Sequence, residues 1–175
     1  MTMTPDRHDD EIAEAPTAVA YLKERVYVSF TGLAIVLVLV DGAEHVDPPA
    51  AFTALLVGLL GVTAAAFASD VIAHLAVHHT FPDKKELLVL LRISLGSLST
   101  AVAPLAMIAL AWLGILRMEP ALAIATYIYI AILGVVGWLA VRHAHLRMLQ
   151  KLIALAMLFA LALAVVLIEI LAHGH

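Results

Sequence analysis

Residues 48–79 read PPAAFTALLVGLLGVTAAAFASDVIAHLAVHH, with no Asp, Glu, Lys or Arg before Asp70. A helix that crosses a membrane needs roughly 20 mainly apolar residues, and the charge-free part of this stretch has that length. A helix at the surface of a soluble protein would instead carry a polar face along its whole length. The stretch therefore predicts a helix surrounded by lipid.

The rest of the chain repeats this pattern. The 175 residues are 63% hydrophobic and only 14% charged, with a mean hydropathy of +1.02, whereas about a quarter of the residues in a soluble domain are charged. We predict an all-α, polytopic integral membrane bundle in one domain, residues 16–175, after a disordered acidic tail, residues 1–15. Its five transmembrane helices are expected at about residues 21–42, 50–79, 85–117, 120–145 and 148–173.

Basic residues in the predicted loops indicate the orientation. Short cytoplasmic loops carry an excess of Lys and Arg. With the N-terminus in the cytoplasm and the C-terminus outside, Arg117 is the one basic residue beyond the outer surface. The acidic start of the chain differs from a signal peptide, which is basic. We therefore expect a multi-pass protein of the plasma (inner) membrane. The basic residues on the cytoplasmic side are then Arg7, Lys23, Arg25, Lys84, Lys85, Arg142, Arg147 and Lys151.

Charge and cysteine content restrict the possible partners. The formal net charge is −4 and there is no long basic tract, so nucleic acid is not an expected partner. There are no cysteines, so a bound metal ion would need imidazole and oxygen ligands.

Three residues of the second predicted span share one helical face: Asp70, His74 and His78. Positions four apart lie above one another on a helix. An acid at the depth of Asp70 is costly in lipid unless it is paired or hydrated. A carboxylate with two imidazoles can relay protons or bind a divalent ion such as Zn, Mn or Fe. The alternative is a structural ion pair between Asp70 and Arg92, which enters the membrane from the same side.

Further polar residues are expected beside this face. Ser97 and Ser99 precede Pro104, a predicted kink, and their hydroxyls can line a polar path or bond to carbonyls that the kink frees. His145, at the cytoplasmic end of the fourth span, is the remaining candidate. The predicted inner ion or proton site thus consists of Asp70, His74, His78, Arg92, Ser97, Ser99 and His145.

A second polar group is predicted on the outside. Asp41, Glu44 and His45 lie within one helical turn, and Glu169 and His173 are four residues apart near the end of the chain. Together they can form a cation site or a mouth that attracts cations. The alternative is an acidic rim that merely lacks basic residues because of the orientation rule.

These residues lead us to expect a small transporter or channel for cations, either protons or a divalent metal ion, and no enzymatic activity. Five helices leave little room for a pathway, so a homo-oligomer is expected. Histidines near pH 6.5 would make the activity depend on pH. One alternative is an accessory or scaffold subunit that binds a partner subunit. Another is an intramembrane metalloenzyme. His74-x3-His78-His79 resembles the first histidine box of membrane desaturases, but those enzymes need several such boxes, and here only His143-x-His145 joins it on the same side.

Overall fold

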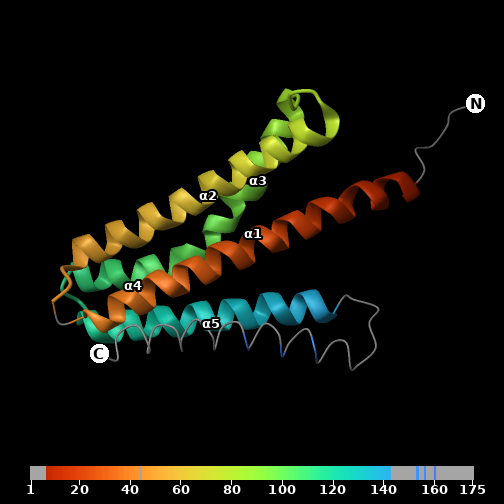
Figure 1. Ribbon diagram of the computed structural model, residues 1–175. Coiled ribbons are helices and arrows are strands. Elements are labelled where there is room, and N and C mark those ends of the chain that lie inside the picture. The colour runs from red at the N-terminus through yellow and green to blue at the C-terminus, as the bar shows by residue number, and fades with distance from the viewer. Residues whose placement is uncertain (1–6, 44, 143–152, 154–155, 157–159, 161–175) are drawn as a thin grey trace, which may run out of the picture.

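A computed structural model describes the backbone of residues 7–43, 45–142, 153, 156 and 160. This described part is all-helical and runs up and down as a bundle (Figure 1). The elements are α1 (Arg7–Asp41), α2 (Pro48–His78), α3 (Lys84–Ser97), the 3-10 turn η1 (Leu98–Ala101), α4 (Val102–Trp112) and α5 (Met118–Arg142). α1 and α4 end, and α2 and α5 begin, at the Asp41 end of the bundle. α2 and α5 end, and α3 begins, at the His78 end.

Three helical segments of the described part are long and apolar enough to cross a membrane: Pro48–His78, Lys84–Trp112 and Met118–Leu139. These segments match the second, third and fourth predicted spans. α1 is longer, but its charge-free stretch extends only over residues 26–40. The fifth predicted span, residues 148–173, lies outside the described residues apart from three isolated positions.

α1 begins earlier than the sequence analysis expected. It starts at Arg7, so residues 7–15, for which we predicted a disordered tail, are helical. Composition alone therefore suggested disorder in a segment that continues an existing helix.

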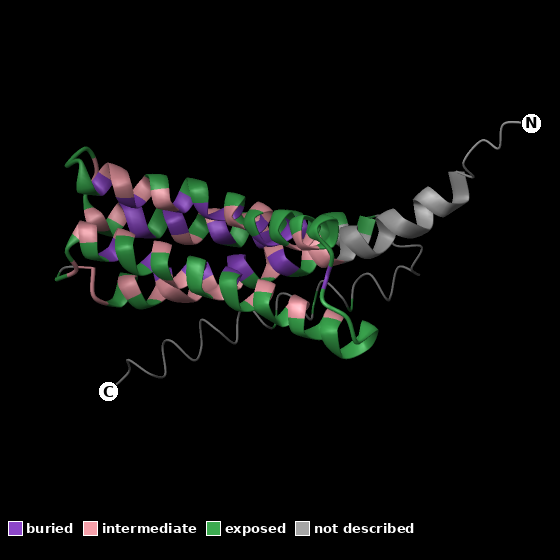
Figure 2. Ribbon diagram, turned by 90° about the horizontal axis from the view of Figure 1, so that it is seen from above, coloured by how far each residue is buried: buried purple, intermediate pink, exposed green. Residues whose placement is uncertain are grey.

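Each helix buries one stripe of small and aliphatic residues against its neighbours. On α2 the stripe contains Ala51, Leu55 and Leu59, spaced four apart, and on α5 it contains Leu122 and Tyr129. α1 contacts α2, α3, η1 and α5, so it is the central helix of the described bundle. Figure 2 shows that these buried positions line the facing sides of the helices, whereas the end of the α2–α3 hairpin is mostly exposed.

The outward faces are also apolar. Large hydrophobic side chains such as Ile72, Tyr127 and Val135 are more than half exposed. Helices that are apolar on both their inner and outer faces need an apolar solvent. The described bundle is therefore compatible with a multi-pass membrane protein, as the sequence predicts.

The predicted kink at Pro104 is confirmed, since the helix narrows to the 3-10 turn η1 just before this proline. Proline cannot donate a backbone hydrogen bond and disturbs the turn before it. Two buried hydroxyls bond to carbonyls across this transition: Ser97 Oγ donates to the Ser94 carbonyl (2.6 Å) and Thr100 Oγ1 to the Ser97 carbonyl (2.8 Å). These two side chains therefore compensate backbone groups at the bend.

α1 and α5 approach each other closely at Gly32. A Cβ atom at this position would overlap the ring of Tyr129, which is completely buried. Small residues allow helices in lipid to pack at short range. The position of Gly32 therefore fixes how near α5 can lie to α1.

We predict that Gly32→Ala destabilises the protein, because the added methyl group must displace a buried aromatic ring. Overpacking of this kind costs about 1–3 kcal/mol. The matched control is Gly61→Ala, because a Cβ there meets nothing within 4 Å. A lowered melting temperature in detergent for Gly32→Ala alone is the expected result, and equal melting of the two variants would contradict the packing.

Candidate functional site

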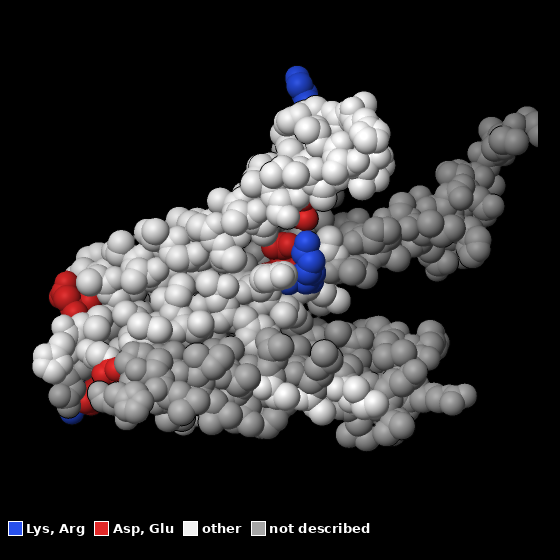
Figure 3. All heavy atoms as spheres, viewed as in Figure 1, with Lys and Arg blue, Asp and Glu red and all other residues white. Residues whose placement is uncertain are grey.

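Lys23 of α1 joins two carboxylates near the His78 end of the bundle. Its Nζ lies 3.1 Å from Glu24 Oε1 and 3.3 Å from Asp70 Oδ1 of α2. Figure 3 shows basic and acidic atoms side by side where α1 passes the α2–α3 hairpin, on a face that is otherwise mostly uncharged. We call Lys23, Glu24 and Asp70 the charged cluster.

Glu24 is the deepest member of the charged cluster. Its side chain is 1% exposed, compared with 20% for Asp70 and 48% for Lys23. It occupies the same face of α1 as the buried residues Val28 and Gly32, at intervals of four. Glu24 therefore takes a core position in the bundle, and helix periodicity alone directs its carboxylate inward.

One oxygen of this carboxylate is bonded and the other is not. Oε1 faces Lys23, whereas Oε2 is buried without a hydrogen-bond partner in the described part of the chain. Ser29 Oγ of α1 and Ser94 Oγ of α3 are also buried without a partner. Buried polar atoms are nearly always satisfied in proteins, by water where no side chain reaches them. These atoms can therefore form hydrogen bonds with water molecules.

Asp70 lies on the α2 face that packs against α1, in line with the buried Thr63. Its described ion pair is with Lys23, so the pairing with Arg92 that we considered from the sequence is wrong. Arg92 is exposed and lies on the opposite side of α3 from the buried Ser94 and Ser97. Asp70 and Arg92 lie towards the same end of the bundle. Position along a helix does not, however, determine which side of that helix faces its neighbour.

The predicted histidines lie beyond the charged cluster towards the loop. His74 Nε2 is 3.7 Å from Glu86 Oε2 of α3, and the rings of His74 and His78 are 4.5 Å apart. Glu86 also completes a capping box with Asp83, the N-cap of α3. Within the described residues, no three His, Cys, Asp or Glu side chains come together as a metal centre. Asp70, His74 and His78 share a face without converging on one point.

The two candidate serines of α3 and η1 point to different places. Ser97 is buried, whereas Ser99 is exposed and accepts a hydrogen bond from Arg25 Nη2 (3.0 Å). Arg25 also lies over the ring of Tyr21, with its guanidinium carbon 4.7 Å from the ring centre. The structure thus separates Ser99 from the buried hydroxyls with which the sequence grouped it.

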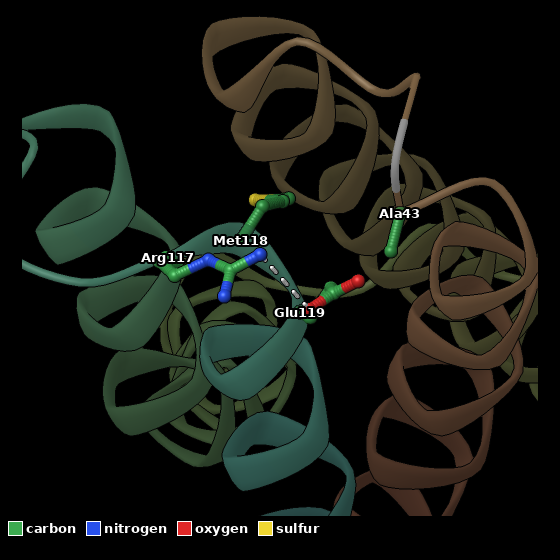
Figure 4. Close-up of a pocket in the computed structure, with 4 residues that line it drawn as sticks. All are labelled: Ala43, Arg117, Met118 and Glu119. Carbon is green, nitrogen blue, oxygen red and sulfur yellow. Dashed lines mark ion pairs between the residues drawn. The ribbon is translucent and has the colours of Figure 1, made fainter.

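A shallow pocket of about 390 Å³ lies at the Asp41 end, between the end of α1 and the turn before α5. Figure 4 shows Glu119 paired with Arg117 (3.6 Å), beside Met118 and facing Ala43. Among the described residues, Asp41 is the one acid predicted for the outer site, and it does not line this pocket. Asp41 and His45 are exposed nearby in the chain. Glu44, Glu169 and His173, and also His145 of the inner site, lie outside the described residues.

Comparison with known proteins adds no assignment. No protein-family model matches the chain, and no curated protein or solved structure is significantly similar to it. The residues and their geometry are therefore the basis for any function.

Glu24 and Lys23 are functional candidates that sequence reasoning missed. The run Lys23-Glu24-Arg25 is typical of the boundary of a span, where all three charges would be solvated. The signal that identifies Glu24 is its spacing of four and eight residues from Val28 and Gly32 on an otherwise apolar face. A charged residue in register with a core stripe indicates burial.

We predict that Lys23→Met destabilises the protein more than the double substitution Lys23→Met with Glu24→Gln. The single change leaves a buried carboxylate without its positive partner, at a cost of about 1–3 kcal/mol, towards the lower value because Lys23 is half exposed. Melting temperatures in detergent give the comparison. Lys84→Met, which removes an exposed lysine at the start of α3, is the control and should melt like the wild type. If the decreases in melting temperature caused by Lys23→Met and by Glu24→Gln simply add in the double variant, the pairing of Lys23 with Glu24 is contradicted.

Proposed function

We propose that the chain is a small membrane transporter or channel for cations that moves protons through the charged cluster. It crosses the membrane five times, with its N-terminus in the cytoplasm and its C-terminus outside, and its pathway is completed in a homo-oligomer. The observation that carries this proposal is the Glu24 carboxylate, which is 1% exposed and has one oxygen without a partner among the residues that the structure describes.

An ionisable side chain inside a membrane bundle is costly, and such residues commonly mark proton or ion pathways. Lys23 bonds to both carboxylates, so it can move towards Asp70 when Glu24 takes up a proton and return when the proton leaves. The cluster can thereby exist with Glu24 protonated or ionised while Lys23 keeps a negative partner. This exchange is what a proton-binding step requires.

The half-exposed Lys23 and the histidines connect the charged cluster with the cytoplasmic surface. His74 lies one helical turn beyond Asp70 and faces Glu86. Towards the centre of the bundle, Ser29 and Ser94 offer hydroxyl oxygens that have no partner in the described part of the chain. Hydroxyls and the water they bind can carry a proton onward from Glu24. The acidic residues at the Asp41 end then attract cations on the outside.

Protons are favoured over a divalent metal ion. Zinc and similar ions need three or four ligands that converge on one point, and the described residues contain no such group. One oxygen of each cluster carboxylate is already bonded to Lys23, whose positive charge also opposes a metal cation. A bridging lysine is therefore compatible with proton exchange and unfavourable for a metal centre.

A scaffold subunit is the second candidate. The observation that favours it is the ion pairing itself, because Lys23 links α1 to α2 through Asp70 and would also serve a purely structural role. Purification separates the two functions. A scaffold brings down a stoichiometric partner subunit and carries no ion flux alone.

The test is proton flux into proteoliposomes that contain a pH-sensitive dye and have an imposed potential. We expect Glu24→Gln and Asp70→Asn to reduce proton flux at least tenfold, because the amide group that replaces each carboxylate cannot take up and release a proton near neutral pH. His74→Ala should shift the pH dependence, because it removes a side chain that can bind and release a proton.

The matched control is Asp83→Asn, which also removes one carboxylate from the His78 end. Asn replaces Asp at a helix N-cap with little loss, so α3 keeps its cap, and flux should stay at the wild-type level. Unchanged flux in Glu24→Gln and Asp70→Asn, with each variant folded and inserted, would exclude the proposed pathway.

A further inference from the structure

A groove separate from the charged cluster runs between α1, η1 and α5. Its volume is about 410 Å³, within the range of cavities that hold small molecules. Arg25 and Ser99 form its polar end, and residues of α5 form most of its apolar wall. The groove thus combines one positive charge with an extended hydrophobic surface.

The positive charge of Arg25 is not neutralised among the described residues. Its Nη2 donates to Ser99 Oγ (3.0 Å) and its guanidinium lies over the Tyr21 ring, and both partners are uncharged. Its Nε is buried and has no hydrogen-bond partner within the described part of the chain. A guanidinium is planar and can donate two parallel hydrogen bonds to one phosphate or carboxylate group. Arg25 therefore retains the capacity to bind an anion.

The apolar wall is a continuous stripe along α5. Ile128, Ile132, Val135 and Leu139 recur at intervals of four and three residues, so they share one helical face. From the helical rise, this stripe is about 16 Å long. Val135 is 55% exposed and Leu139 36% exposed. A wall of this length suits an acyl chain lying along the helix.

We propose that this groove binds an anionic phospholipid, with its phosphate on Arg25 and one acyl chain along the α5 stripe. A small soluble anion would leave the apolar wall unused, and an uncharged amphiphile would leave Arg25 without a counter-charge. In the proposed orientation Arg25 lies towards the cytoplasmic leaflet, whose anionic lipids attract basic side chains near the membrane surface. The lipid site uses no residue of the charged cluster.

The experiment is lipid titration of the purified full-length protein in neutral detergent, followed by native mass spectrometry. Phosphatidylglycerol, phosphatidylcholine and inorganic phosphate are the probes. We expect phosphatidylglycerol to bind more tightly than phosphatidylcholine, and Arg25→Met to weaken it by about tenfold, because a hydrogen-bonded charge pair is lost.

Arg92→Met is the matched control, since Arg92 is an exposed arginine of α3 that does not line the groove, and it should bind phosphatidylglycerol like the wild type. Ile132→Trp keeps the charge but fills the groove, and should also weaken binding; it carries the test if Arg25→Met does not fold. Equal affinity of Arg25→Met and Arg92→Met, or no effect of Ile132→Trp, would overturn the proposal. Binding of inorganic phosphate as tight as that of the lipid would assign the site to small anions instead and overturn the lipid assignment.

Discussion

Glu24 places a carboxylate among apolar side chains, where its ionised form is stable only beside a positive charge. Lys23 supplies that charge and also bonds to Asp70 of α2, so the central helix and its neighbour are joined through one ammonium group. Removing one partner of a buried ion pair destabilises a protein far more than replacing both partners by apolar residues, because the remaining charge is left unpaired. The position of α2 beside α1 is therefore coupled to the ion pairs that Lys23 makes with Glu24 and Asp70.

The central position of α1 extends this coupling to the rest of the described bundle. α1 contacts α2, α3, η1 and α5, and Gly32 lets Tyr129 of α5 lie directly against it. Charged residues of α1 gather towards the His78 end of the bundle, where they contact different neighbours. Lys23 pairs with Asp70, and Arg25 donates a hydrogen bond to Ser99. Two separate polar regions thus arise from residues two positions apart in the chain, because such positions on a helix point about 200° apart.

The helical class, three candidate membrane-spanning helices and the kink at Pro104 could be predicted from the sequence, since they depend on local composition and on the chemistry of proline. The partner of Asp70 could not, because Lys23 and Arg92 come from the same end of the bundle and only the rotation of each helix decides between them. Glu24 was missed because its neighbours in the chain are charged, although its neighbours on the helix are apolar. Local composition was therefore enough to predict the helices, whereas the direction in which each side chain faces required the packed structure.

The central claim is that Glu24 is a buried carboxyl that exchanges a proton. Infrared difference spectroscopy of the protein in lipid, recorded while the pH is lowered, measures this directly. We expect a protonated-carboxyl band that appears on acidification, is absent in Glu24→Gln and persists in Asp83→Asn. An unchanged band in Glu24→Gln would assign the proton to another acid and contradict the account.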